Sequence, residues 1–269
     1  MTPNLLKKRS KGYEQFDIQK YKDSIARSEL PAEHIPSIIK GLGNINNYFT
    51  TAQLCTKTYK LILKQSKTYA ANYNLKRAVY ALGPTGYPFE KLCAQILKAK
   101  GYEIEVSVVK EGKFVRHEID VVAKREDNIL YCECKFHSNK SQKNDVKIPL
   151  YVNSRWMDLQ ANLDFKVDYA LLSNTPFSKD AVAYAKGVGM KLYSLNDPSC
   201  TSLLDMIKKY KVYPVTSLRS LSLKHKKALL QKGIVTIKQV SAETLEEEGV
   251  EPQKIEKILQ EVKILTRPN

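Results

Sequence analysis

Hydrophobic positions recur at helical spacing through the first third of the chain. The segment FDIQKYKDSIARSEL spaces its apolar side chains near the period of an amphipathic helix, and residues 50–65 and 68–82 do the same. A short strand-like run precedes them. The pattern therefore predicts a mainly helical domain over residues 1–84.

The pattern changes after GPTGYP, residues 83–88, a turn-rich stretch and a natural domain boundary. An amphipathic helix, FEKLCAQILKAKGY, comes next. Three strand-like runs follow, EIEVSVV, HEIDVVAK and NILYCECKF, with REDN as the turn between the last two. Helical and strand patterns then alternate. This order predicts an α/β domain with a mixed central sheet over residues 85–212.

Beyond Tyr213 the pattern is helical again. Two helix–turn–helix-like units have their turns at Gly233 and Gly249, and they predict a helical domain over residues 213–269. The expected fold class is therefore multidomain α+β, with helical domains on both sides of an α/β core.

Charge points to a polyanionic partner. The chain has 44 lysines and arginines against 28 acidic residues, a net charge of +16, and residues 1–86 hold 14 of these basic residues against 5 acidic ones. Such an excess favours nucleic acid or nucleotide phosphates, with a basic surface kept for solubility as the alternative. No apolar run of about 18 residues occurs, so we expect a cytoplasmic protein without membrane contact. The five cysteines form no C-x-x-C pair and predict reduced thiols.

Candidate chemistry lies on two neighbouring strand-like runs. Strand alternation projects Glu133 and Lys135 to one side, and a hairpin would bring Asp120 beside them. Two carboxylates next to an ammonium group suit a Mg²⁺ or Mn²⁺ ion and a phosphodiester. A solvated sheet edge is the alternative.

The order of these residues resembles the PD-(D/E)XK nuclease superfamily, in particular its Mrr-like restriction-endonuclease branch. The matching positions are Asp120 and Glu133-Cys134-Lys135, with HEID in place of a literal PD, and Glu90 on the preceding helix. The resemblance implies that Asp120 and Glu133 bind the metal, that Lys135 assists catalysis and that Glu90 is an additional acidic residue of the site.

Four further residues around the motif are candidate substrate contacts. His117 and His137 flank it, and Lys147 and Arg155 recur at helical spacing after it. Structural roles for the histidines and a solvated helix face for the other two are the alternatives.

The amino-terminal segment resembles the ATP-cone, a nucleotide-binding regulatory domain. The resemblance rests on Lys8-Arg9, Phe16-Asp17 and Lys20, although Ser10-Lys11 stands where the family has Asp-Gly. It implies that Lys8, Arg9 and Lys20 contact the phosphates of ATP or dATP. A basic arm that binds DNA is the alternative.

Read together, the segments resemble the ATP-cone–restriction-endonuclease fusion family, with a carboxy-terminal part similar to helix–hairpin–helix repeats. This resemblance implies a metal-dependent DNA endonuclease regulated by ATP or dATP. A non-cleaving, nucleotide-responsive DNA-binding or assembly protein and a structure-specific, junction-resolvase-like nuclease are alternatives. We expect a homo-oligomer, because double-strand cleavage by one site per chain favours a dimer.

Overall fold

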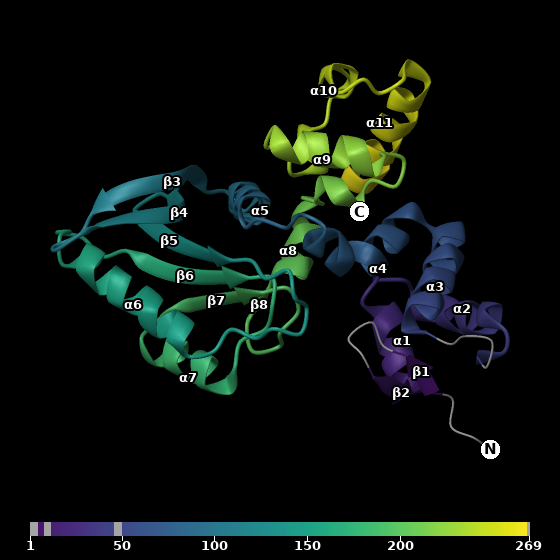
Figure 1. The fold of residues 1–269 in the computed structure, drawn as a ribbon, viewed down its shortest axis with the longest axis horizontal. Helices are drawn as coiled ribbons and strands as arrows, with labels where there is room; N and C mark the ends of the chain where they lie inside the picture. The colour runs from purple at the N-terminus through teal and green to yellow at the C-terminus, as the bar shows by residue number, and fades with distance from the viewer. Residues whose placement is uncertain (1–4, 8–11, 46–49, 268–269) are drawn as a thin grey trace. The chain divides into compact units, whose positions relative to one another are not determined.

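The computed structural model describes residues 5–7, 12–45 and 50–267, and it divides into two compact units (Figure 1). Unit 1 comprises Met1–Leu75 with Lys263–Asn269, and unit 2 comprises Lys76–Val262. The three-part division expected from the sequence is finer than this and stays a prediction. None of the described helices is long and apolar enough to cross a membrane.

Unit 1 combines a short antiparallel hairpin with helices. Its elements are β1 (Leu5–Lys7), β2 (Tyr13–Gln15), α1 (Ile18–Ala26), η1 (Ala32–His34), α2 (Ile35–Leu42), α3 (Thr51–Gln65) and the first part of α4 (Lys67–Tyr80). Helix α1 begins at Asp17, whose side chain accepts the backbone N–H groups of Gln19 and Lys20. Buried side chains such as Tyr21, Ile25 and Ile62 form one core, as the helical spacing predicts.

Unit 2 is built on a mixed six-stranded sheet. The order is β3-β4-β5-β6-β7-β8, in which the first three strands are antiparallel and the remaining pairs are parallel. The strands are β3 (Glu103–Glu111), β4 (Arg116–Arg125), β5 (Asn128–Lys135), β6 (Asp168–Ser173), β7 (Lys191–Ser194) and β8 (Thr201–Ser202). The mixed central sheet expected from the sequence is therefore confirmed.

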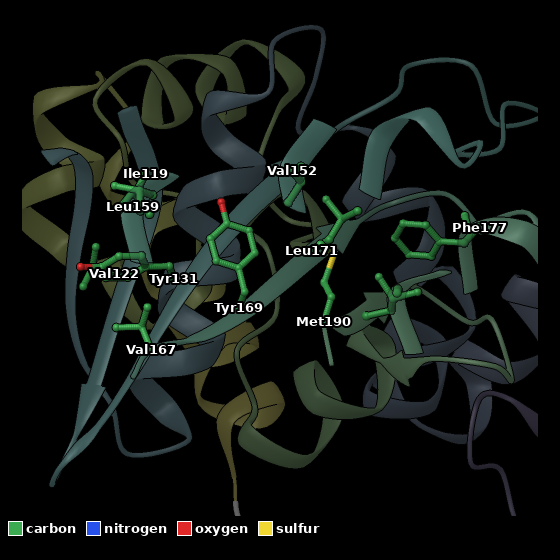
Figure 2. Close-up of a cluster of buried hydrophobic side chains, with 13 residues drawn as sticks. Ile119, Val122, Tyr131, Val152, Leu159, Val167, Tyr169, Leu171, Phe177 and Met190 are labelled. Carbon is green, nitrogen blue, oxygen red and sulfur yellow. The ribbon is translucent and has the colours of Figure 1, made fainter. Parts of the chain in front are cut away.

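Helices cover both faces of this sheet. Helices α6 (Lys147–Gln160) and α7 (Lys179–Gly187) contribute Val152 and Ala181 to a core that also takes Tyr131 and Leu171 from the strands (Figure 2). Helix α5 (Tyr87–Ala99) packs against β3, β4 and β5 from the other side. Because both faces are covered, β5 is a near-continuous buried run rather than an alternating one.

The last part of unit 2 is helical. Its elements are α8 (Leu203–Tyr210), η3 (Val215–Ser217), α9 (Leu223–Gln231), η4 (Ile237–Gln239), α10 (Ala242–Glu247) and most of α11 (Pro252–Thr266). Two backbone bonds tie the η3 and η4 turns, Val215 N to Val235 O at 2.8 Å and Ile237 N to Tyr213 O at 2.9 Å. These bonds join the chain before α9 to the chain after it.

Candidate active site

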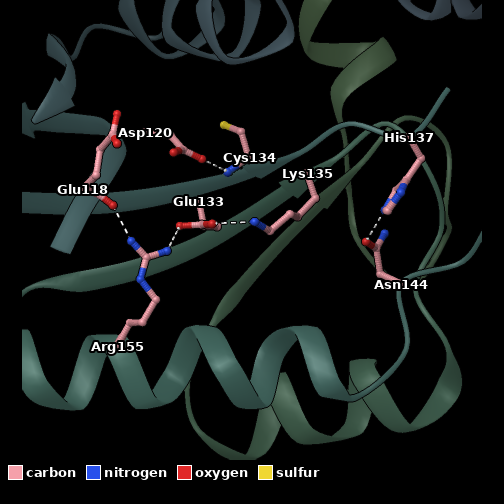
Figure 3. Close-up of polar contacts among 8 residues, drawn as sticks. All are labelled: Glu118, Asp120, Glu133, Cys134, Lys135, His137, Asn144 and Arg155. Carbon is pink, nitrogen blue, oxygen red and sulfur yellow. Dashed lines mark hydrogen bonds and ion pairs between the residues drawn. The ribbon is translucent and has the colours of Figure 1, made fainter. Parts of the chain in front are cut away.

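The candidate carboxylates lie where the pairing of β4 with β5 ends. The ladder runs up to Val121 opposite Cys132. Asp120 is one residue earlier in β4. Its side-chain Oδ2, in place of a backbone oxygen of β4, accepts the Cys134 backbone N–H at 2.6 Å (Figure 3). The strand that carries Glu133 therefore also holds the Asp120 carboxylate in place.

Glu133 is buried, with 4% of its surface exposed, and a cation donates to each of its oxygens. Lys135 Nζ lies 2.7 Å from Oε1, and Arg155 Nη1 of α6 lies 2.5 Å from Oε2 (Figure 3). A buried carboxylate needs such partners, because burial without them costs several kcal/mol. Since β5 is also an interior strand, the alternative of a solvated sheet edge is wrong.

The electrostatics join these groups into one site. Burial, followed by the negative charge of Glu133, raises the pKa of Asp120 to about 7, against the opposing effect of the Cys134 N–H. Burial lowers the pKa of Lys135, but its hydrogen bond and attraction to Glu133 outweigh this and raise it. Lys135 is therefore an ammonium ion at neutral pH.

Glu90 faces the same carboxylates from the first turn of α5. Burial raises its pKa, and the charges of Glu118 and Glu133 raise it further. The GPTG junction accommodates this approach, since a Cβ on Gly86 would lie 3.1 Å from Glu90 Oε1. The structure thus brings Glu90 within electrostatic reach of the strand residues.

His117 points away from these carboxylates to α6. Its Nε2 lies 2.7 Å from Asp158 Oδ2, and both side chains are 11% exposed. Asp158 also accepts the backbone N–H groups of Phe114 and Val115. This arrangement gives His117 a structural role between the β3–β4 hairpin and α6.

His137 is likewise bound into the framework. Its backbone N–H donates to Asn174 Oδ1 at 2.8 Å, and its Nε2 lies 2.9 Å from Asn144 Oδ1. Asn144 is fully buried and donates to Ser173 Oγ at 2.9 Å. The segment between β5 and α6 is thereby fixed directly after Lys135.

The two candidate cations of α6 differ in their exposure to solvent. Lys147 is exposed at the start of the helix. Arg155 is stacked over the Tyr151 ring at 5.6 Å and bonds Glu133 as well as the backbone oxygen of Glu118. From the sequence, Arg155 was expected to be a substrate contact or part of a solvated helix face. Its pairing with Glu133, across 22 residues, carries no local signal.

The candidate nucleotide contacts are only partly covered by the structure. Lys8 and Arg9 lie outside the described residues. Lys20 lies in the first turn of α1, where its backbone N–H donates to the Asp17 side chain. The proposed phosphate contact of these three residues is therefore untested.

The donor set suits a hard divalent cation. Asp120 and Glu133 offer oxygen ligands, which Mg²⁺ and Mn²⁺ prefer, and their two carboxylates lie close enough for the charge of Glu133, after burial, to raise the pKa of Asp120. Within the described ranges, no three His, Cys, Asp or Glu side chains form a metal-holding group. A two-carboxylate site that keeps several waters is the arrangement that Mg²⁺ commonly takes. The residues therefore fit the ion.

The neighbouring thiols are not part of this chemistry. Burial raises the pKa of Cys132 well above its usual value, and a hydrogen bond to Cys93 together with burial does the same for Cys134. Both remain thiols at neutral pH, and neither is a nucleophile.

Comparison with known proteins gives matches to two domain families, to a solved structure and to a protein sequence. Residues 83–197 match the family described as Restriction endonuclease, and residues 213–266 match the one described as AF1548-like, C-terminal. A structure titled "Crystal Structure of Protein of Unknown Function AF1548" is 29% identical, with a TM-score of 0.56, covering 67% of this chain and 98% of that one. An uncharacterized protein of Archaeoglobus fulgidus is 31% identical over 173 residues, which are 63% of this chain and 97% of that protein. The chain therefore belongs to the family of this Archaeoglobus protein, and it carries a restriction-endonuclease domain followed by an AF1548-like C-terminal domain.

Proposed function

We propose that this protein is a divalent-metal-dependent endonuclease that hydrolyses phosphodiester bonds in DNA. The observation that carries the proposal is the convergence of Asp120, Glu133 and Lys135 at the end of the β4–β5 ladder, inside the restriction-endonuclease domain. The net charge of +16 suits a polyanionic substrate.

Each residue has a distinct role in this proposal. Asp120 and Glu133 hold the Mg²⁺ or Mn²⁺ ion, which supplies a Lewis acid for the phosphodiester and lowers the pKa of bound water. Lys135 stays charged and stabilises the negative charge that develops on phosphate oxygens. Glu90 adds negative charge to the metal side of the site. We expect products with 5′-phosphate ends.

Plasmid cleavage tests the proposal. The purified full-length protein should nick supercoiled plasmid in Mg²⁺ or Mn²⁺ and be inactive in EDTA, and Glu133→Gln should lose the activity while it remains folded. Equal nicking by wild type and Glu133→Gln would identify a contaminating nuclease and remove the proposal.

A non-cleaving DNA-binding role is the second candidate. It is favoured by one observation, namely that both oxygens of Glu133 are already paired with side-chain cations, as in a structural ion-pair network. In that case DNA would bind with equal affinity in Mn²⁺ and in EDTA, and no cleavage would appear in either.

We propose further that ATP or dATP regulates the protein through unit 1, with Lys8, Arg9 and Lys20 at the phosphates. Calorimetric titration with both nucleotides requires the full-length chain, because unit 1 includes Lys263–Asn269. Regulation predicts that saturating nucleotide changes the cleavage rate. Confirmed binding with an unchanged rate would leave unit 1 a nucleotide-binding module without control of the nuclease.

Substrate form and assembly belong to the same proposal. Junction-resolvase-like activity predicts faster cleavage of branched than of linear duplexes, and a homodimer predicts paired nicks on opposite strands. Assays on linear, branched and modified duplexes, together with light scattering of the intact protein, separate these forms.

A further inference from the structure

Arg155 is held at two points in the candidate site. Nη1 donates to Glu133 Oε2 at 2.5 Å, and Nη2 donates to the backbone oxygen of Glu118 on β4. Its guanidinium also stacks on Tyr151, one turn earlier in α6. A planar guanidinium with two fixed donors sets both the position and the orientation of the group that it bonds.

Lys135 bonds the other oxygen of Glu133 in a looser way. Its Nζ, at the end of a flexible four-carbon stem, donates to Oε1 at 2.7 Å. Its side chain is 32% exposed, whereas that of Arg155 is 13% exposed. Of the two cations, Lys135 therefore loses less when it leaves Glu133, because water can solvate its ammonium group.

A divalent ion at Glu133 competes with the two cations for the carboxylate. Both oxygens of the Glu133 carboxylate are paired, Oε1 with Lys135 and Oε2 with Arg155. A divalent ion shared with Asp120 has to take one of these oxygens. Exchange at Oε2 would break the bond from Arg155 Nη1 and leave a largely buried guanidinium without its carboxylate partner, which is unfavourable.

We infer that Arg155 is the positioning residue of Glu133, and that Lys135 is its exchangeable partner. Arg155 keeps Oε2 and fixes the carboxylate between α6 and the end of β4. The oxygen that Lys135 holds is the one given up to the metal, which frees the ammonium group for phosphate. The inference rests on the proposed function, and it assigns to Arg155 an action through Glu133 rather than on the substrate.

Mn²⁺ binding to the intact protein tests the assignment independently of catalysis. Free Mn²⁺ is followed by electron paramagnetic resonance for wild type, Lys135→Met and Arg155→Met, with no DNA present. Lys135→Met should bind at least as tightly as wild type, because a competing cation is gone. Arg155→Met should bind roughly 10–100-fold more weakly, as metal ligands do when their hydrogen-bonding partner is lost.

Two further variants keep the test decisive. Arg155→Lys retains the charge but cannot make both bonds, so its Mn²⁺ affinity should lie between those of wild type and Arg155→Met, and it carries the test if Arg155→Met fails to fold. Arg125→Met, which removes an arginine over Tyr102 at the other end of β4, should bind as wild type does.

The outcomes separate the inference from the proposed function. Arg155→Met that folds and binds Mn²⁺ as tightly as wild type, or more tightly, would show that Arg155 only competes with the ion, and it would overturn the inference. A wild type that binds no Mn²⁺ would instead contradict the metal-dependent function. In plasmid cleavage, Arg155→Met should lower kcat and leave KM for DNA unchanged, since Arg155 does not contact the substrate.

Discussion

The pKa of the Asp120 carboxylate is set by opposing influences. Burial and the charge of Glu133 disfavour its ionised form, whereas the Cys134 N–H favours it, and the balance leaves the pKa at about 7. An ordinary aspartate ionises near 3.8. Between these two pH values the folded protein holds a proton that the unfolded chain has lost, so the folded state becomes less stable as pH rises through this window.

The first prediction concerns this pH dependence. In metal-free protein, Asp120→Asn should gain stability relative to wild type as pH rises from 5 to 7, because the neutral amide has no proton to lose. The gain is at most about 1.4 kcal/mol per pH unit. Urea unfolding of both proteins at several pH values measures it. A constant difference between the two proteins would show that Asp120 ionises in its ordinary range.

At the residue scale, the sequence pattern predicted which strand residues share a face, but it did not predict their hydrogen-bonding partners. Alternation along one strand is enough to place Glu133 and Lys135 on one face, since it depends only on the backbone. The bonds of Arg155 and of His117 depend instead on where α6 lies across the sheet, which tertiary packing decides. His117 and His137 accordingly have framework partners that no local pattern indicated.

The connection between β5 and α6 is fixed by one buried amide. Asn144 Nδ2 donates to Ser173 Oγ and Thr175 Oγ1, while Oδ1 lies 2.9 Å from His137 Nε2. The segment after β5 therefore closes onto β6.

The second prediction follows from this closure. Asn144→Ala should lower the free energy of unfolding by about 1–3 kcal/mol, because it removes the buried hydrogen bonds of the Asn144 amide to Ser173 and Thr175. Asn139→Ala, in the same connection but exposed, should stay within about 0.5 kcal/mol of wild type. Denaturant titration of both variants is the measurement, and equal stabilities would contradict the role of Asn144.

At the element scale, periodicity predicted nearly every described helix and strand of unit 2. The three strand-like runs correspond to β3, β4 and β5, and REDN forms the turn between the last two, with Glu126 at positive φ. The two-residue strand β8 was missed, since Thr201–Ser202 is too short for any period to show. Strand order was also not predictable, because the parallel pairs join segments far apart in the chain.

At the scale of the whole molecule, the basic charge is distributed unevenly among the parts. At the carboxy-terminal turn of Gly233, the backbone N–H donates to Leu230 O at 3.0 Å. The neighbouring Lys232 pairs with Glu247 and Glu248. This turn is therefore engaged within the protein.

The third prediction is a steep salt dependence of DNA binding. Because each phosphate contact releases counterions, the affinity for a non-specific duplex in EDTA should fall by at least about tenfold between 50 mM and 200 mM salt. Fluorescence anisotropy with a labelled duplex measures it. Lys232→Met should show the same slope as wild type, since its charge is already paired. Affinity independent of salt would exclude phosphate attraction as the basis of binding.

The site that joins Asp120, Glu133 and Lys135 is tested most directly by the plasmid nicking rate of Asp120→Asn at saturating Mn²⁺. This substitution removes the carboxylate charge of Asp120 and little volume. We predict a rate at least about 100-fold below wild type, corresponding to the loss of about 3 kcal/mol of transition-state stabilisation. Asp180→Asn, in the first turn of α7, should keep the wild-type rate. A rate for Asp120→Asn equal to that of wild type would contradict the assignment of this site as a metal-dependent phosphodiesterase centre.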